Sequence, residues 1–267
     1  MNKAEKALNE INAMDRLAAQ DSPVHRLSPL CKLFITVIYI AATVSFQKYN
    51  ITGISVMVLF PVFGYIVSGI PVSQCFRKLR IVMPLVCAVG LVNPFFDREV
   101  IMTVAGVGIS GGVISMLTLM LKGVFSLMMS FLLIATTSIG AICHGLRQIH
   151  FPKVLTSLIM LTYRYISVLL KETAIMTQSY HLRAPGQRGI HISAWGSFLG
   201  QLILRSMDRA SEIYDGMMLR GFSGDFYYAT VKRADAASWI TAVLVGALVV
   251  LARIYNVAYM LGALFVK

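Results

Sequence analysis

Charged side chains are scarce in this sequence, and acidic ones most of all. Only 13% of the 267 residues are charged, against roughly 25% in a soluble domain, while 57% are hydrophobic and the mean hydropathy is +0.72. The twelve acids all lie outside the long apolar stretches or at their flanks. So few charges in so apolar a chain exclude an ordinary soluble domain, and the composition predicts an integral membrane protein.

The motifs of a self-sufficient enzyme or metal site are also missing. The four cysteines show no paired spacing and the five histidines are dispersed, which argues against a disulfide framework or a zinc site. No GxxxxGK[ST] loop, HExxH motif or Ser/His/Asp arrangement occurs, so we expect the chain neither to hydrolyse ATP by itself nor to bind a cofactor. Residues 1–29 are polar and carry acids, so we expect no cleavable signal sequence.

What the sequence does have is a series of apolar stretches of membrane-crossing length. An amphipathic lead over residues 1–29, suited to the membrane surface, precedes them. The predicted spans cover residues 30–47, 51–70, 81–96, 112–137 and 237–258. Residues 72–80 read as a basic connector, and the glycine-rich part of 97–110 as a loop able to form a hairpin. The fold class is therefore predicted as an all-α integral membrane protein with about five transmembrane helices. Residues 259–266 are expected to extend the last span or to fold back at the interface, and a sixth short span stays open.

Basic residues are distributed unevenly around these spans. Of the 24, five lie in the lead and at the start of the first span, three in 72–80 and eleven in 138–236. Cytoplasmic loops carry such an excess, so the N-terminus and residues 138–236 are predicted to be cytoplasmic. The net charge of +12 forms no basic tail or aromatic-interleaved patch, and we expect no nucleic-acid partner. Three regions result: 1–137 with the lead and four spans, 138–236, and 237–267 with the last span.

The most informative stretch in the polar region is residues 199–222. Its apolar residues recur at steps of four and three, which indicates one stripe of a helix: Ile203, Met207, Ala210, Tyr214 and Met217. Arg205 and Asp208, like Arg209 and Glu212, are opposite charges at i,i+3, which predicts a charged face with ion pairs along it. Gly221 then stands where a glycine usually ends a helix. The helix is thus predicted to present Arg220 at its C-terminus.

A second arginine occupies a similar setting. Residues 171–184 (KETAIMTQSYHLRA) read as a helix that Pro185-Gly186 breaks, with Arg183 as its last strong side chain. Two helices that each end in an exposed arginine suit an acidic groove on a partner. The alternative is that each arginine caps its own helix dipole or meets anionic lipid headgroups.

Lys122 is the one ionisable residue deep inside a predicted span. It would serve an anion site in a channel or membrane enzyme. We favour instead a lysine that snorkels or meets the helix-end carbonyls of a neighbour. With no inverted repeat and no selectivity-filter motif evident, the profile is that of a subunit that transmits a partner's motion.

These residues resemble a known family. Arg205–Asp225 (RSMDRASEIYDGMMLRGFSGD) is similar to the signature of the transmembrane T component of energy-coupling factor (ECF) transporters. Leu219-Arg220-Gly221 matches its second Ala-Arg-Gly triplet, with Leu for the usual Ala. The first falls at Leu182-Arg183-Ala184, where both flanks differ; Gln187-Arg188-Gly189 is a rival by composition. We assign Arg183 because KETAIMTQSYH before it aligns without a gap. Two more stretches agree: Pro152–Glu172 and, with the cobalt-type member CbiQ, Asp15–Phe34.

The resemblance implies a non-catalytic coupling subunit in the membrane of a bacterial or archaeal cell. Its expected partners are two ATP-binding-cassette ATPases, which use ATP and Mg, and a small substrate-capture membrane protein of the CbiM type with a CbiN-like subunit. The substrate is expected to be cobalt, with nickel or a vitamin such as biotin as alternatives. The triplet residues would contact the ATPases, supported by the helix residues Arg205, Arg209, Glu212 and Tyr214.

Overall fold

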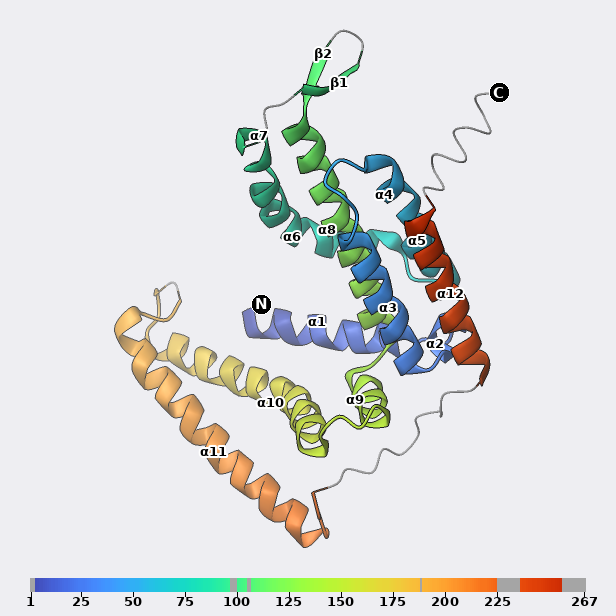
Figure 1. The fold of residues 1–267 in the computed structure, drawn as a ribbon. Helices are drawn as coiled ribbons and strands as arrows, with labels where there is room; N and C mark the ends of the chain where they lie inside the picture. Colours follow the sequence, from blue (N-terminus) through green and yellow to red (C-terminus); the bar gives the residue numbers. More distant parts are fainter. Residues whose placement is uncertain (1–2, 97–99, 105–106, 188, 225–235, 256–267) are drawn as a thin grey trace. The chain divides into compact units, whose positions relative to one another are not determined.

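The structure is a computed structural model that describes residues 3–96, 100–104, 107–187, 189–224 and 236–255. The described chain is almost wholly helical (Figure 1), which confirms the predicted fold class. A two-stranded antiparallel ribbon is the exception: β1 (Val100–Val104) pairs with β2 (Val107–Ser110) within the stretch expected to form a loop or hairpin.

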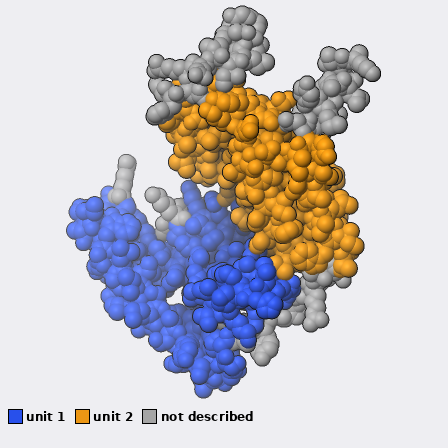
Figure 2. All heavy atoms as spheres, viewed as in Figure 1, with its two compact units in different colours: residues 1–16, 139–231 blue, residues 17–138, 232–267 orange. Residues whose placement is uncertain are grey.

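Two compact units divide the chain (Figure 2). Unit 1 combines residues 1–16 with 139–231, and unit 2 combines residues 17–138 with 232–267. The helices of unit 1 are α1 (Lys3–Ala18, whose last two residues belong to unit 2), α9 (Ile139–Gln148), α10 (Lys153–Arg183), the 3-10 turn η1 (Ile192–Ala194) and α11 (Trp195–Leu219). Those of unit 2 are α2 (Pro23–Arg26), α3 (Pro29–Val44), α4 (Ile51–Met57), α5 (Leu59–Ser68), α6 (Val72–Gly90), α7 (Asn93–Phe96), α8 (Gly111–Thr136) and α12 (Ala236–Ile254).

Four helical stretches of the described chain are long and apolar enough to cross a membrane. Three coincide with predicted spans, namely Ile51–Ser68, Gly111–Thr136 and Ala236–Ile254, and α3 is a shorter apolar helix at the position of the first span. The fourth is α10, whose hydropathy of 1.4 is well below the 2.0 to 2.1 of the others. Since α10 also carries Arg164, Lys171 and Glu172, we keep it outside the membrane-spanning set. The side of the membrane on which unit 1 lies stays a prediction.

Residues 72–80 differ from the predicted connector, because they form the first turns of α6. Pro71 is the N-cap of this helix, and the next proline is Pro84, inside the helix. Neither glycine nor proline occurs between them, so nothing interrupts the helix from the basic segment into the third span.

The second predicted span is two helices, and a proline accounts for the break at Val58. Pro61 has no N–H, so the carbonyl of Met57 lacks the donor that a continuous helix would supply four residues later. The hydroxyl of Tyr39 donates to that carbonyl at 2.8 Å instead. Gly69, in the left-handed conformation with φ of 70°, ends α5.

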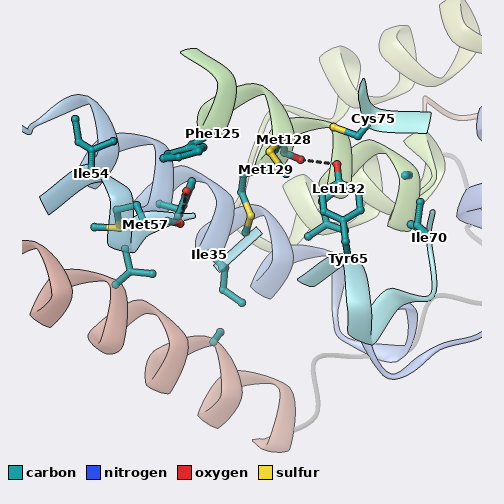
Figure 3. Close-up of a cluster of buried hydrophobic side chains, with 14 of the residues drawn as sticks. Ile35, Ile54, Met57, Tyr65, Ile70, Cys75, Phe125, Met128, Met129 and Leu132 are labelled. Carbon is teal, nitrogen blue, oxygen red and sulfur yellow. Dashed lines mark hydrogen bonds between the residues drawn. The ribbon is translucent and has the colours of Figure 1, made fainter. Parts of the chain in front are cut away.

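The core of unit 2 gathers apolar side chains from α3, α4, α5, α6, α8 and α12 (Figure 3). Tyr65 reaches across it and donates a hydrogen bond to the carbonyl of Met128 at 2.9 Å. A small residue allows α6 and α8 to approach closely, because a Cβ on Gly123 would come within 3.0 Å of Val86.

Lys122 contacts carbonyls at the end of a neighbouring helix, which agrees with the interpretation that the sequence analysis favours. Its Nζ donates to the carbonyl of Val44, the last residue of α3, at 3.0 Å and to that of Phe46, just past the helix, at 2.5 Å. These carbonyls have no donor within their own helix, so the ammonium supplies what the backbone lacks. In the described chain, the ammonium group of Lys122 therefore has a structural role.

Two further cations in unit 2 do the same. Lys32, near the start of α3, donates to the carbonyl of Thr136 at the end of α8 at 2.7 Å and to that of His25 at 3.2 Å. Arg253, near the end of α12, donates to the carbonyl of Ser45 at 2.8 Å. Helices α3 and α8 therefore each contribute a lysine that satisfies the other's C-terminal end.

Replacing Lys122 by methionine keeps the length of the side chain but removes its donors. We expect the variant to lose about 1–3 kcal/mol of stability, because the α3 carbonyls are left without a partner. The measurement is thermal unfolding of the detergent-solubilised chain. Lys171→Met, at an exposed position of α10, is the matched control and should stay within about 0.5 kcal/mol. Equal unfolding curves for both variants would contradict the capping role.

Candidate functional site

Helices α10 and α11 form a long antiparallel hairpin within unit 1. They contain 31 and 25 residues and are joined by residues 184–194. The two helices meet next to this link and separate away from it (Figure 1). The hairpin carries every residue that the sequence assigns to partner contact, so its geometry defines the candidate site.

Tyr180 organises the reversal between the two helices. Its carbonyl accepts the N–H of Ala184 at 3.0 Å, which closes the last turn of α10. Its hydroxyl donates to Oε1 of Gln187 at 2.9 Å and accepts the N–H of His191 at 3.3 Å. The chain breaks at Pro185-Gly186, where Gly186 has φ of 94°, as the sequence predicts.

The end of α11 is closed by backbone hydrogen bonds. Gly221 has φ of 77°, its N–H donates to the carbonyl of Met218 at 3.0 Å, and the N–H of Phe222 donates to that of Met217 at 3.0 Å. This pair of bonds around a left-handed glycine is the Schellman motif. It confirms the predicted stop and places Arg220 as the last residue before the turn.

Arg183 and Arg220 both lie at helix ends and both are exposed. Their neighbours are exposed too, with Leu182 at 77% and Leu219 at 90% of full accessibility. No contact of either guanidinium group is found in the described part of unit 1. Because α11 spans roughly 37 Å, the two arginines stand at opposite ends of the hairpin. The rival Arg188 lies outside the described residues.

The charges along the hairpin pair differently from the simple helical pattern. Arg209 and Glu212 form the predicted i,i+3 pair at 3.3 Å. Arg205 does not pair with Asp208; it forms an ion pair with Glu172 of α10. An i,i+3 spacing favours a contact only where no better acceptor lies nearby. Here the antiparallel packing of the two helices brings Glu172 close to Arg205, so Arg205 pairs with Glu172 and not with Asp208. This pair therefore joins the two helices.

A shallow groove of about 320 Å³ runs between the helices. Its walls are almost entirely apolar, and Arg209 and Tyr214 from the supporting set lie along it. From α10 the lining residues are Leu161, Thr162, Tyr165, Val168 and Leu169; from α11 they are Ser206, Arg209, Ala210, Ile213, Tyr214 and Met217.

The hairpin is left largely uncovered by the rest of the described chain. None of the 25 residues of α11 is buried, and on α10 only Thr156 and Ser157 are. Met207 and Tyr214 of the predicted apolar stripe remain 62% and 57% exposed. An amphipathic helix gains its stability by burying its apolar face. These helices are therefore built to be covered by another protein or by lipid.

The described titratable groups of unit 1 do not assemble into a chemical site. Groups of three or more His, Cys, Asp or Glu able to hold a metal do not occur among the described residues. On α9, burial and then the charge of Arg147 lower the pKa of His144, and burial raises the pKa of Cys143. Both changes favour the neutral side chain, which suits a packed position rather than acid–base chemistry.

Sequence reasoning missed the residues that hold the hairpin. Tyr180 and Glu172 make their contacts over seven or more positions, beyond the reach of helical periodicity. A third contact joins α1 to α10, where Tyr163 donates to the carboxylate of Asp15 at 2.6 Å. The sequence of α10 contains three tyrosines and a single acid, Glu172, and neither residue type indicates which partner it contacts.

Comparison with known proteins gives consistent results. The model of a family described as cobalt transport protein, CbiQ, matches residues 20–228. The cobalt transport protein CbiQ of Rhodobacter capsulatus is 29% identical over 105 residues, which are 38% of this chain and 42% of that protein. The energy-coupling factor transporter transmembrane protein EcfT of Bacillus selenitireducens is 26% identical over 219 residues, 76% of this chain and 81% of its own. The nickel permease LarQ of Lactiplantibacillus plantarum is 26% identical over 98 residues, 37% of this chain and 36% of its own.

Two glycines of the α11 segment should respond oppositely to alanine. Gly221→Ala places a Cβ at a left-handed residue and should destabilise the helix end by about 1–2 kcal/mol. Gly216→Ala, inside the same helix with open space around it, should stabilise it by about 0.5–1 kcal/mol. The measurement is hydrogen exchange of the amides of residues 216–222 in the full chain. Exchange that changes in the same direction in both variants would contradict the C-cap geometry.

Proposed function

Because the chain belongs to the CbiQ family of cobalt transport proteins, we propose that it is the transmembrane coupling subunit of an ECF importer for cobalt ion. In this proposal unit 1 faces the cytoplasm and two ATP-binding-cassette ATPases dock on the α10–α11 hairpin. The hairpin transmits their motion to a substrate-capture membrane protein of the CbiM type, with a CbiN-like small subunit. ATP and Mg act in the ATPases, so the chain is not itself an enzyme.

One observation carries the proposal: two exposed arginines stand at the opposite ends of one uncovered helical hairpin. A pair of equivalent contacts roughly 37 Å apart suits two copies of one partner better than a single small ligand. Arginine suits such a contact because its planar guanidinium stays charged and binds a carboxylate through two hydrogen bonds. The exposed leucine before each arginine adds apolar area at the same place.

The substrate follows from the relatives rather than from this chain's own side chains. The family description and one relative name cobalt, and another relative is named a nickel permease. We therefore propose cobalt first and nickel as the alternative, with specificity residing in the capture protein. A self-sufficient anion channel is disfavoured, because Lys122, its main support in the sequence, is bound to carbonyls of α3.

Reversing the charge of the two triplet arginines tests the coupling role. We expect Arg183→Glu combined with Arg220→Glu to abolish ion uptake by the assembled transporter while the chain still inserts. A glutamate in an acidic groove leaves like charges unpaired, at a cost of about 3–5 kcal/mol per site. At a helix end that only meets lipid or water, the change is worth about 1 kcal/mol or less. Uptake is measured in cells that express the complete transporter, with membrane insertion checked in parallel.

The control variants distinguish an effect at the two triplet arginines from a general effect of changing the surface charge. Lys171→Glu makes the same reversal on the exposed surface of α10 and should leave uptake close to wild type. Arg188→Glu compares the two possible first triplets, and a loss of uptake there with normal uptake in Arg183→Glu would move the triplet to residues 187–189. Wild-type uptake by the Arg183/Arg220 double variant would refute the coupling mechanism.

The partners are tested by gentle purification of the tagged chain from its native membranes. We expect two copies of an ATP-binding-cassette ATPase and a small capture protein, identified by mass. A capture protein that binds nickel or a vitamin would keep the mechanism and replace the substrate. Recovery of the chain alone, under conditions that preserve other membrane complexes, would contradict the coupling role.

A further inference from the structure

The ion pair between Glu172 and Arg205 lies part of the way along the hairpin. Trp195 begins α11, so Arg205 stands about 15 Å from the link and Arg220 about 37 Å from it. The groove between the helices lies on the far side of the pair from the link. The hairpin is thus held at the link by Tyr180 and at one intermediate point by this pair.

We propose that Glu172 is a positioning residue, whose ion pair with Arg205 sets the separation of α10 and α11 and thereby the place of Arg220 relative to Arg183. The inference rests on the proposed function, in which these two arginines contact the ATPases. Geometry gives the pair leverage: a change of about 1 Å at Arg205 becomes about 2–3 Å at the end of α11, because that end is more than twice as far from the link.

Exposure suits the pair to a moving part. The side chains of Arg205 and Glu172 are 52% and 32% accessible, and ion pairs at such positions contribute little net stability. The pair biases the hairpin toward one separation without locking it. No residue of α11 is buried by the described chain, so apolar packing does not take over this role.

Interhelix distance measured by pulsed electron resonance tests the positioning directly. Spin labels at Ile166→Cys on α10 and Ser211→Cys on α11, in a chain without its native cysteines, report the separation on the groove side. We expect Glu172→Ala to lengthen and broaden the distance distribution. The charge swap Glu172→Arg with Arg205→Glu should restore it. An unchanged distribution in Glu172→Ala overturns the proposal.

Asp208→Ala is the matched control. It removes an equal charge one turn from Arg205, at the position that helical spacing would pair with it, but it has no contact across the hairpin in the described chain. We expect its distance distribution to match that of the parent. If it shifts as far as that of Glu172→Ala, then the local charge and not the cross-helix pair sets the separation, and the proposal fails.

The functional consequence is measured in the assembled transporter in proteoliposomes as ions transported per ATP hydrolysed. We expect this ratio to fall about two- to fivefold in Glu172→Ala and to recover in the charge swap. If Glu172→Ala changes the interhelix distance but leaves the number of ions transported per ATP unchanged, then the positioning by Glu172 plays no role in coupling and the proposal fails. Because the distance is measured on the chain alone, failure of the ATPase proposal would appear instead as insensitivity of uptake to the Arg183 and Arg220 reversals.

Discussion

The structure depends on one requirement of helices in an apolar environment: the carbonyls at each C-terminal end need donors from outside the helix. Unit 2 meets it with side chains. Lys122 and Arg253 serve the end of α3, Lys32 serves the end of α8, and Tyr39 serves the carbonyl that Pro61 leaves open. Three cations of the described part of this unit, Lys32, Lys122 and Arg253, are thereby accounted for as parts of the scaffold.

Unit 1 meets the same requirement differently, and the difference bears on function. At the end of α11 the backbone around Gly221 supplies the donors, so the side chain of Arg220 is not needed as a cap. At the end of α10 the N–H of Ala184 closes the last turn, and Arg183 again extends from the helix. An arginine that its own helix does not use, on a surface that the described part of the chain does not cover, is suited to contact another protein.

Local features of the fold could be predicted from the sequence, and contacts between distant residues could not. Gly221, Gly69 and Pro185-Gly186 mark helix ends because the cause lies within a few residues. The partner of Arg205 lies 33 positions away and that of Lys122 lies 76 and 78 positions away, so no periodicity identifies them. His150 shows the limit of local rules as well: with φ of 60° it takes the left-handed position at the end of α9 where a glycine is usual.

The helices inside unit 1 and those inside unit 2 are held by interactions of different strength, and this difference suits the transmitting role proposed above. Unit 2 has a continuous apolar core with close helix contacts, so its helices resist relative displacement. Unit 1 is held by polar contacts at the surface: Tyr180 to Gln187 and Glu172 to Arg205 within the hairpin, and Tyr163 to Asp15 between α10 and α1. Few buried apolar contacts mean a low free energy of local rearrangement. The hairpin can therefore change its separation under a force too small to disturb the core.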